Sequence, residues 1–379
     1  MSKLRVGVLF GGRSGEHEVS LRSARSVVAA FNPQRYEVVL LAIDKQGRWL
    51  LGQNAAGLLA APGSLIPQEE SGQRSAVSSQ QSAVSQLSVV ARPEIRGETL
   101  AGLDVIFPVL HGPLGEDGTV QGLLELADLP YVGCGVAASA VGMDKATCKA
   151  VFATHNLPQV PYLALKRRRW ETEPEAVLDA IEAQLRYPVF VKPANLGSSV
   201  GISKATDRAS LGQALDEAAR YDRRLVVEQG IDAREIEVSV LGNDEPLASL
   251  PGEIVPRREF YDYAAKYITD DSELLIPAPL TPQQTAEVQR LAVAAFLAID
   301  GAGMARVDFL LDRKTDQIYL NEVNTIPGFT SISMYPKLWE ASGLPFPQLL
   351  DRLIQLALER HADKSRSETS FNLGQQQGL

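Results

Sequence analysis

Short apolar strands alternate with helices in the N-terminal third of the chain, and this alternation restricts the fold more than any other feature. Strands are expected at 5–10, 36–43 and 104–110, and helices at 20–31 and 119–127. Strands that are separated by helices pair in parallel, with the helices covering the faces of the sheet. We therefore expect the chain to begin with a parallel-sheet α/β domain.

Two further units follow, in which strands and helices are mixed. The second unit is expected to contain strands at 160–165, 187–193, 200–205 and 224–229 and helices at 144–155 and 175–185. The third is expected to contain strands at 235–242, 304–312 and 317–324 and helices near 282–299 and 345–361. The expected domains are 1–134, with a Ser/Gln-rich low-complexity insertion at 67–90, then 135–231, 232–364 and a flexible tail at 365–379.

Composition excludes several classes of protein. The net charge is −9, from 37 Lys and Arg against 46 Asp and Glu, so a broad basic surface for nucleic acid is not expected. The two cysteines, Cys134 and Cys148, form no CxxC pair, which argues against a disulfide framework or a structural zinc site. No apolar run reaches the roughly 18 residues of a membrane span, and the first apolar run is too short for a signal peptide. We expect a cytoplasmic protein.

The stretch NEVNTIPGF ends a short strand with two oxygen donors on one face. Glu322 and Asn324 stand at i and i+2, so their side chains point the same way. Arg306 and Asp308 have the same spacing on the preceding strand, and the short connection predicts an antiparallel pair. Asp308, Glu322 and Asn324 can therefore converge, and their oxygen atoms are ligands that Mg²⁺ prefers. The alternative is a solvated sheet face whose acidic groups pair with Arg306.

Two glycine-rich turns expose backbone N–H groups that suit anions. Lys192 ends a strand before the loop ANLGSS, whose glycines and serines can cradle phosphate oxygens. A plain β-hairpin tip is the alternative there. In FGGRSGEHEVS, a strand leads through two glycines into a helix. There Glu16 or Glu18 could interact favourably with the positive end of the helix dipole, or could bind a substrate ammonium group.

Three other stretches carry weaker signals. His111 stands at the end of a strand and opens a Gly-rich loop, where it can serve a chemical or a structural role. Residues 131–140 contain G-x-G-x-x-A, but no acidic residue follows at the spacing that dinucleotide binding needs, so NAD binding is not expected. Residues 258–278 are long, aromatic and charged, as lids often are, and Lys266 and Tyr267 could reach a site on closure.

The order of these stretches is more informative than any one of them. The chain contains, in sequence, GGRSGEHEVS, HGPLGEDGTVQG, GMDK, VKPANLGSSVG, EIEVSVLG, YDYAAKY, ARVDF and NEVNTIPGFTSIS. This series strongly resembles the D-alanine–D-alanine ligases, which are ATP-grasp enzymes. The resemblance runs from about residue 3 to about residue 362, and the chain departs from it mainly at 67–90 and in the tail. It implies an α/β fold of three domains, in which an N-terminal parallel-sheet (preATP-grasp) domain precedes two α+β ATP-grasp subdomains.

The resemblance also implies a reaction. ATP would phosphorylate the carboxylate of one D-alanine, and the amine of a second D-alanine would attack the acyl phosphate. The product, D-alanyl-D-alanine, would enter peptidoglycan precursors for the cell wall. ATP would act as substrate with two Mg²⁺ or Mn²⁺ ions, and some members also use a monovalent cation. Members are often dimeric, so we expect a homodimer, with no nucleic acid or membrane partner.

Matching the motifs assigns an expected role to each residue. The expected metal ligands are Asp308, Glu322 and Asn324, with Glu322 bridging two ions. The expected ATP ligands are Lys145, Lys192, Ser199, Glu228 toward adenine, Glu237 on the ribose, and Lys266. For the first D-alanine, Glu16 is expected to bind the ammonium group and His111 to lie near the carboxylate. For the second D-alanine, Ser333 is expected to bind the carboxylate. Arg306 and the N–H of Gly328 are expected to form the oxyanion hole. A hydrogen-bonded chain of Glu16, Ser198 and Tyr267 would hold the lid closed.

Other functions fit parts of the sequence. A D-alanine–D-lactate ligase or another carboxylate–amine ligase would share the fold, but the lactate-forming ligases of vancomycin resistance replace the lid tyrosine, which AAKY keeps as Tyr267. A non-catalytic ATP-binding regulatory module should lack part of the metal and oxyanion set, yet Arg306, Asp308, Glu322 and Asn324 are all present. A nicotinamide oxidoreductase would rest on GCGVAA alone.

Overall fold

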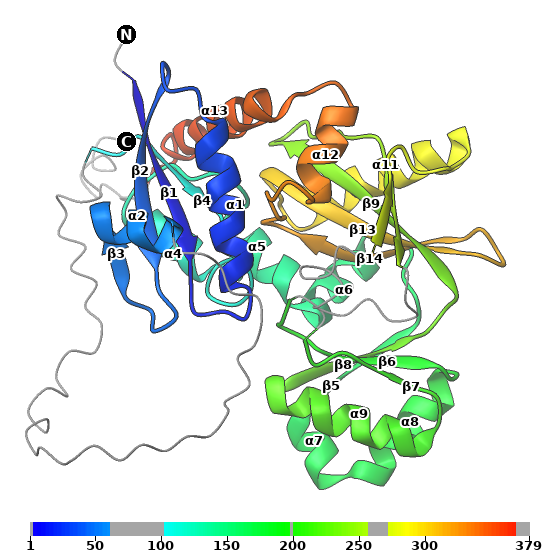
Figure 1. Ribbon diagram of the computed structural model, residues 1–379. Helices are drawn as coiled ribbons and strands as arrows, with labels where there is room; N and C mark the ends of the chain where they lie inside the picture. Colours follow the sequence, from blue (N-terminus) through cyan, green and yellow to red (C-terminus); the bar gives the residue numbers. More distant parts are fainter. Residues whose placement is uncertain (1–2, 61–101, 198–199, 257–271, 369–379) are drawn as a thin grey trace, which may run out of the picture.

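Three separate β-sheets organise the protein in the computed structural model, which describes residues 3–60, 102–197, 200–256 and 272–368. Figure 1 shows the first sheet in blue and cyan, the second in green below, and the third beside the first. The expected insertion at 67–90, and Ser198, Ser199, Lys266 and Tyr267, lie outside the described residues. Within the described residues, no helix combines the length and the apolar character that crossing a membrane requires.

The first sheet is parallel apart from one short edge strand, as the alternation predicts. Its strands, in spatial order, are β3 (Trp49–Leu51), β2 (Tyr36–Ile43), β1 (Leu4–Gly11) and β4 (Val105–Pro108). The central strand β1 pairs in parallel with β2 and β4 and is buried from Val6 to Gly11, which explains the unbroken apolar run VGVLFG. The helices of this unit are α1 (His17–Ala30), α2 (Gly52–Ala60) and α4 (Thr119–Leu126).

The second sheet is antiparallel, and three helices of this unit cover one of its faces. Its order is β5 (Tyr162–Lys166), β8 (Arg224–Gln229), β6 (Val189–Pro193) and β7 (Ser203–Ala205). The covering helices are α7 (Arg167–Thr172), α8 (Pro174–Gln184) and α9 (Arg208–Tyr221). They lie on the side away from the third sheet (Figure 1), so the other face is turned toward the rest of the molecule.

The third sheet is also antiparallel. Its order is β12 (Ser272–Leu275), β11 (Gly252–Pro256), β9 (Ala233–Gly242), β13 (Gly303–Asp312) and β14 (Ile318–Asn324), with β10 (Leu247–Ala248) paired to β9. Its helices are α11 (Pro282–Ala298) and α12 (Met334–Ala341). The predicted antiparallel pairing of the two strands that carry Asp308 and Glu322 is confirmed. One parallel and two antiparallel sheets agree with the expected fold class.

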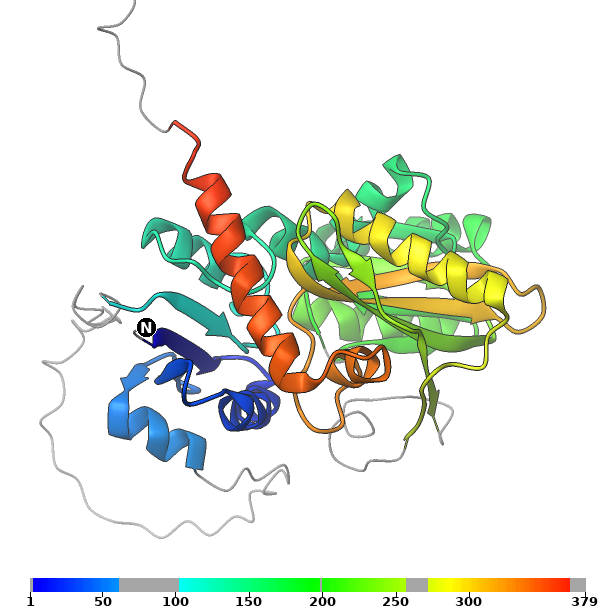
Figure 2. The ribbon, with the colours of Figure 1, turned by 90° about the horizontal axis from the view of Figure 1, so that it is seen from above.

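Helices connect the units and fix their arrangement. The first unit leads into the second through α5 (Val136–Met143) and α6 (Lys145–Thr154), and Asp144 caps α6 by accepting a hydrogen bond from the N–H of Thr147 at 2.8 Å. The last helix, α13 (Phe346–Lys364), returns to the first sheet, where its apolar side joins the same core as Val8 and Phe107. Figure 2 shows α13 lying between the first and third sheets.

Candidate active site

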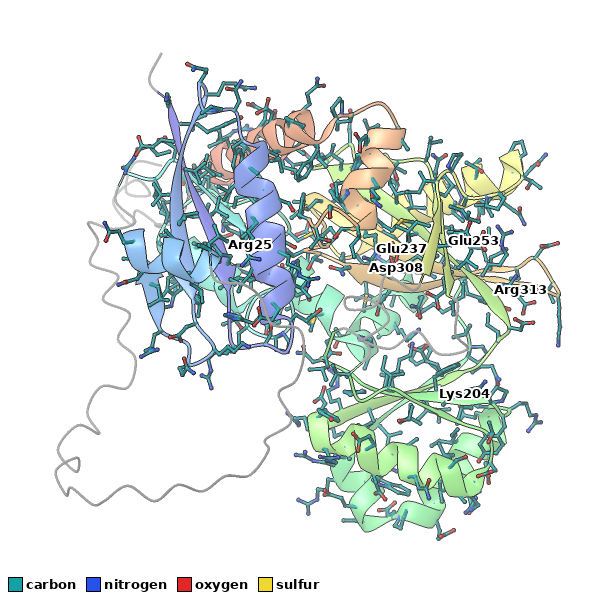
Figure 3. All side chains as sticks on the ribbon, viewed as in Figure 1. Arg25, Lys204, Glu237, Glu253, Asp308 and Arg313 are labelled. Atoms are coloured by element: carbon teal, nitrogen blue, oxygen red, sulfur yellow. The ribbon has the colours of Figure 1, made fainter. Side chains whose placement is uncertain are left out.

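A cavity of about 940 Å³ lies where the three units meet. Its lining comes from all of them and includes Glu16, Glu116, Lys145, Lys192, Glu228, Glu237, Arg306, Asp308, Glu322, Asn324, Gly328 and Ser333. Figure 3 shows Glu237 and Asp308 next to each other on the third sheet and Lys204, another lining residue, on the second. Most of the lining residues are polar, charged or glycine, where a buried wall would favour apolar residues, and a cavity of this size suits a nucleotide and a small second ligand.

Three carboxylates form a row across the third sheet. Strand β13 lies between β9 and β14, and the register places Asp308 opposite Glu237 on one side and Glu322 on the other. Residues that face each other across strands have side chains about 5 Å apart. Asn324 lies two residues beyond Glu322 on the same face. The sequence predicted Asp308, Glu322 and Asn324 as neighbours, and Glu237 extends the row.

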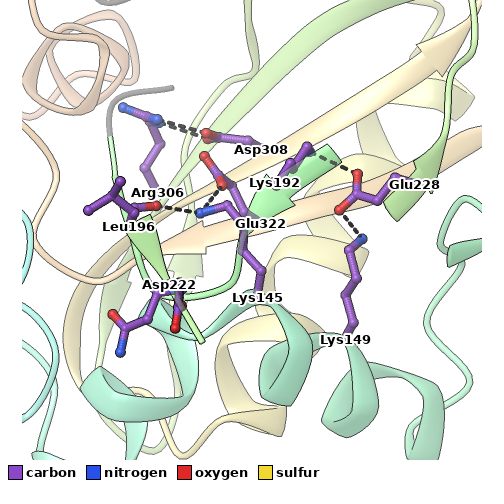
Figure 4. Close-up of polar contacts among 10 residues, drawn as sticks. Lys145, Lys149, Lys192, Leu196, Asp222, Glu228, Arg306, Asp308 and Glu322 are labelled. Carbon is purple, nitrogen blue, oxygen red and sulfur yellow. Dashed lines mark hydrogen bonds and ion pairs between the residues drawn. The ribbon is translucent and has the colours of Figure 1, made fainter. Parts of the chain in front are cut away.

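Two cations lie against this row, and Figure 4 shows Arg306 beside Asp308 and Lys145 beside Glu322. The guanidinium of Arg306 donates two hydrogen bonds to Asp308, both at 2.7 Å, and its Nε lies 3.1 Å from Glu237. Lys145 Nζ donates to the carbonyl oxygen of Leu196 at 2.8 Å and lies 3.6 Å from Glu322 Oε2. The ion pairing with Arg306 is the alternative that the sequence left open, but it occurs in a cavity rather than on a solvated face.

The donor set suits a divalent cation. Carboxylate and amide oxygens are hard ligands, and the Oδ1 atom of Asn324 is buried without a hydrogen-bond donor among the described residues. Among the described residues, no three His, Cys, Asp or Glu side chains are already positioned to hold a metal ion together. Asp308 is turned toward Arg306 instead, so binding an ion at this carboxylate would require Arg306 to release it.

A second charged group lies on the second sheet. Glu228 on β8 accepts a hydrogen bond from Lys192 Nζ at 2.8 Å, and its other oxygen lies 3.2 Å from Lys149 Nζ. Burial alone would raise the pKa of Glu228, but the two lysines lower it to about 2. Glu228 opposes the burial effect on Lys192, whose pKa is raised. Lys192 is therefore a charged group that faces the cavity, as a phosphate ligand must be.

Two buried carboxyl groups meet at Gly112 in the first unit. The N–H of Gly112 donates to Glu116 Oε1 at 2.8 Å, and a Cβ atom on Gly112 would lie 2.6 Å from Glu16 Oε2. A Cβ on Gly197, from the second unit, would also crowd Glu16 Oε2, at 2.8 Å. Glycine at both positions therefore leaves room for Glu16. Glu18, the other acidic residue of this motif, instead forms an ion pair with Lys45 at 2.9 Å.

Burial and the neighbouring charge of Glu16 raise the pKa of Glu116 to about 8. Glu116 is 7% exposed and lines the cavity. At neutral pH this end of the cavity therefore holds one more proton than two ordinary carboxyl groups would. A substrate ammonium would meet both carboxyl groups.

His111 lies behind the cavity wall rather than on it. Its Nδ1 is 3.1 Å from the carbonyl oxygen of Ile326, and its Nε2 is 3.1 Å from Ser23 Oγ. Ser23 Oγ also accepts the N–H of Phe329 at 3.2 Å. Burial lowers the pKa of His111 to about 4. A neutral ring with the proton on Nδ1 satisfies every partner, so His111 holds the turn that contains Gly328, and its expected place beside a substrate carboxylate stays a prediction.

Ser333 precedes α12 and lies over the same turn. Its Oγ receives the N–H of Thr330 at 3.0 Å, and a Cβ on Gly328 would come within 2.7 Å of it. The N-terminus of α12 carries partial positive charge toward this part of the cavity, where Ile332, Ser333 and Met334 form the lining. An anionic group would be favoured here.

Among the residues in and around this site that the sequence did not single out, Glu116, Glu235 and Lys149 stand closest to the predicted ones. Glu116 lies inside the motif HGPLGEDG, which drew attention only to His111. Glu235 lies two residues before Glu237 on β9, so its position on the same face could have been found from strand periodicity. Lys149 lies four residues after Lys145 on α6, a spacing that places both lysines on one side of a helix.

Known proteins resemble the chain over nearly its whole length. The family model described as D-ala D-ala ligase N-terminus matches residues 5–134, and the model described as D-ala D-ala ligase C-terminus matches residues 151–355. A D-alanine–D-alanine ligase of Heliobacterium modesticaldum is 55% identical over 372 residues, which is 97% of this chain and 98% of the relative. One of Bacillus cytotoxicus is 49% identical over 366 residues, which is 97% of this chain and 99% of that relative.

Solved structures show the same likeness. The D-alanine–D-alanine ligase from Coxiella burnetii has a TM-score of 0.78 and 39% identity, covering 96% of this chain and 97% of that one. The VanG D-Ala:D-Ser ligase from Enterococcus faecalis has a TM-score of 0.76 and 33% identity, covering 94% of this chain and 100% of that one.

Proposed function

The chain belongs to the D-alanine–D-alanine ligase family, and we propose that it joins two D-alanines into D-alanyl-D-alanine while converting ATP to ADP and phosphate. The product would serve the synthesis of peptidoglycan precursors. The observation that best supports this proposal is the continuity of the cavity. It brings together lysines for phosphate, the row of carboxylates and a buried carboxyl end for an ammonium.

The first step would take place beside the row on the third sheet. Lys145 and Lys192 are proposed to hold the phosphates of ATP, because both ammonium groups face the cavity. The carboxylate oxygen of the first D-alanine would attack the γ-phosphorus, and ADP would leave. Phosphoryl transfer depends mainly on positioning and on neutralising charge, which the two lysines and Arg306 would supply.

Asp308, Glu322 and Asn324 would hold two Mg²⁺ or Mn²⁺ ions, with Glu322 shared between them. The ions would neutralise charge on the phosphates when bound. The support for this is the row of hard oxygen ligands and the unpaired buried oxygen of Asn324. Ion binding at Asp308 would also free the guanidinium of Arg306 for the reacting groups.

The second step would use the turn around Gly328. The amine of the second D-alanine would attack the acyl carbon, and the oxyanion that forms would face Arg306 and the N–H of Gly328. Phosphate would then leave with the oxygen that came from the first carboxylate. Glu16 would bind the ammonium of the first D-alanine, and Ser333, at the start of α12, the carboxylate of the second.

Glu228 and strand β9 would bind the nucleoside. Glu228 and residues 229–233 after it line the cavity, and adenine would lie against them. Glu237 was expected at the ribose, but its carboxylate pairs with Arg306. Glu235 also lines the cavity and acts electrostatically on Lys192. We therefore propose that Glu235 shares the ribose role and that Glu237 also orients Arg306.

Residues outside the described part of the chain complete the proposal. Ser199 and Lys266 would contact ATP, and Ser198 and Tyr267 would join Glu16 in closing the lid. Tyr267→Phe is then expected to increase ATP hydrolysis relative to dipeptide formation, measured as the ratio of phosphate to D-alanyl-D-alanine released. A ratio and a rate equal to those of the parent would exclude the lid chain.

We further propose a homodimer in the cytoplasm, following the family. Sedimentation equilibrium would measure the mass of the particle against the 41.0 kDa of one chain. A monovalent cation requirement would appear as a dependence of rate on K⁺ at constant ionic strength.

The function is tested by phosphate release with ATP and Mg²⁺ in four mixtures: D-alanine, L-alanine, D-alanine with D-lactate, and no amino acid. Release that depends on D-alanine, with the mass of D-alanyl-D-alanine as product, is expected. A mixed product with D-lactate would favour the D-alanine–D-lactate ligase. ATP binding without release in any mixture would favour the regulatory module.

A further inference from the structure

Lys149 is a buried lysine that the proposed reaction does not use. Its side chain is 2% exposed, and Lys149 is not among the residues that line the cavity. Its Nζ lies 3.2 Å from Glu228 Oε1 and 5.3 Å from the centre of the Tyr162 ring. A buried ammonium group is costly unless a carboxylate pairs with it. Its position therefore depends on Glu228.

Glu228 is shared between two lysines on opposite sides of the cavity wall. Lys149 holds Oε1 from α6, behind the wall, whereas Lys192 holds Oε2 at 2.8 Å and faces the cavity. Figure 4 shows the Glu228 carboxylate between the two ammonium groups. The side chain of Glu228 is 4% exposed, so it also requires a partner at all times.

This sharing matters when a phosphate enters. The ammonium group of Lys192 cannot form its strongest hydrogen bonds to Glu228 and to a phosphate at the same time. If Lys192 were the only partner of Glu228, its movement toward a phosphate would leave a buried carboxylate unpaired. Lys149 removes this cost because it stays with Glu228 while Lys192 moves.

We propose that Lys149 is a positioning residue that allows Lys192 to exchange Glu228 for a phosphate of the bound nucleotide. The proposal rests on the proposed function in one respect, namely that Lys192 binds phosphate. Lys149 itself touches no substrate. Its effect reaches the nucleotide through Glu228 and Lys192, and it concerns the phosphates rather than the nucleobase.

The test compares nucleotides with and without phosphates. Lys149→Met keeps an unbranched side chain that is one atom shorter and removes the charge. Calorimetric titration of the variant with ATP and with ADP, in the presence of Mg²⁺, is expected to show Kd values raised about tenfold. The Kd for adenosine should stay within about twofold of the parent, and so should the KM for D-alanine.

Two control variants separate the possible causes. Lys192→Met should weaken ATP but not adenosine, and if it leaves ATP binding unchanged, the phosphate role of Lys192 in the proposed function fails. Arg234→Met removes the cation from another buried carboxylate, Glu253, which Arg234 contacts at 2.6 Å outside the cavity. It should reduce thermal stability as Lys149→Met does, without changing the Kd for ATP.

Three results would overturn the inference. The first is that Lys149→Met binds ATP as tightly as the parent does. The second is that Lys149→Met loses as much affinity for adenosine as for ATP. The third is that Arg234→Met loses as much affinity for ATP as Lys149→Met does. If Lys149→Met does not fold, Glu228→Gln and the double variant Glu228→Gln/Lys149→Met replace it, because neither buries an unpaired carboxylate. Equal ATP affinities for these two are expected, and a further loss in the double variant would overturn the inference.

Discussion

At the scale of single residues, Glu322 contacts more than one charged group of the site. It faces Asp308 across the β13–β14 pair and has Lys145 Nζ 3.6 Å from its carboxylate. Its charge therefore acts both on the carboxylate row and on Lys145, which is proposed to bind phosphate. A change of charge at this position should be felt in the reaction more than in the fold.

Glu322→Gln is expected to reduce turnover by about 100-fold or more, because an amide keeps the shape of the side chain but removes its negative charge and one of its two oxygen ligands. The measurement is kcat at saturating Mg²⁺, with circular dichroism as the check on folding. Glu340→Gln, an exposed position on α12, is the matched control and should retain full activity. Near-normal turnover of Glu322→Gln would remove it from the metal site.

Glu116 should give the protein a pH-dependent stability of known sign. Burial, and then the charge of Glu16, raise its pKa from 4.5 to about 8, so the folded protein binds more protons than the unfolded chain between these values. The free energy of unfolding should therefore fall as the pH rises from 4.5 to 8. Glu116→Gln cannot titrate, so urea unfolding at pH 6, 7 and 8 should show a smaller decline than in the parent. Equal declines would contradict the assignment.

His111 should act with the opposite sign at lower pH. Burial lowers its pKa from 6.5 to about 4, so the unfolded chain binds more protons and stability falls as the pH drops through this range. The shift corresponds to about 3 kcal/mol. His111→Asn should lose this part of the acid sensitivity, measured by urea unfolding between pH 4 and 7. If the free energy of unfolding changed with pH in the same way in the parent and the variant, His111 would not titrate in this way.

Residue spacing predicted only the part of the site that lies on single strands. Side chains two residues apart on a strand lie on the same face, which placed Glu322 with Asn324 and Arg306 with Asp308. The short turn between the two strands predicted that they pair. The pairing of Lys149 with Glu228 brings α6 against β8, and no local pattern specifies such a contact. Glu116 was missed because a carboxyl group in a Gly-rich loop does not show from sequence that it will be buried.

At the scale of elements, α13 links the third unit to the first. Leu349, Leu350, Leu353 and Ile354 are buried in one core with Val8 and Phe107. Tyr36 on β2 donates a hydrogen bond to Asp351 at 2.6 Å, and Arg360 reaches the carbonyl oxygen of Gly133. The helix therefore determines how the first sheet stands relative to the cavity.

Leu353→Ala is expected to destabilise the protein by about 2–5 kcal/mol, because Leu353 is fully buried and its truncation leaves a cavity. Urea unfolding followed by circular dichroism measures the change. Gln355→Ala, exposed on the same helix, is the control and should change stability by less than about 0.5 kcal/mol. A similar small change for Leu353→Ala would show that α13 is not part of the core.

The long elements could be predicted from the sequence, whereas several of the short ones could not. The strand expected at 36–43 has those bounds, and the helix expected at 20–31 begins earlier, at His17. Strands β3 and β10 have only 3 and 2 residues, too few to show a period. Helix α5 begins within the G-x-G-x-x-A stretch, and the strand expected before it is reduced to an isolated β-bridge between Tyr131 and Ile106.

At the scale of the whole molecule, the site exists only because three units meet. Phe329 shows how closely they are joined, since its ring contacts Phe107 of the first sheet and Tyr335 of α12, with centroids 5.7 and 5.6 Å away. The neighbouring Gly328 is thereby held against the first unit. The order of the expected strands and helices was enough to divide the sequence into units. How the apolar surfaces of these units pack together depends on long-range contacts, which no local sequence pattern specifies. The domain limits proposed from sequence stay predictions, and α13 shows why, since it packs on a unit other than its own.

The central claim is that a carboxylate oxygen of D-alanine receives the phosphoryl group of ATP in this cavity. The most direct measurement uses D-alanine whose carboxylate is labelled with ¹⁸O and follows the label into the released phosphate by mass spectrometry. If the acyl phosphate forms and the amine of the second D-alanine displaces phosphate, each phosphate carries one ¹⁸O atom and each dipeptide keeps one at its new amide. Unlabelled phosphate would show that ATP is cleaved by water, and would contradict the account.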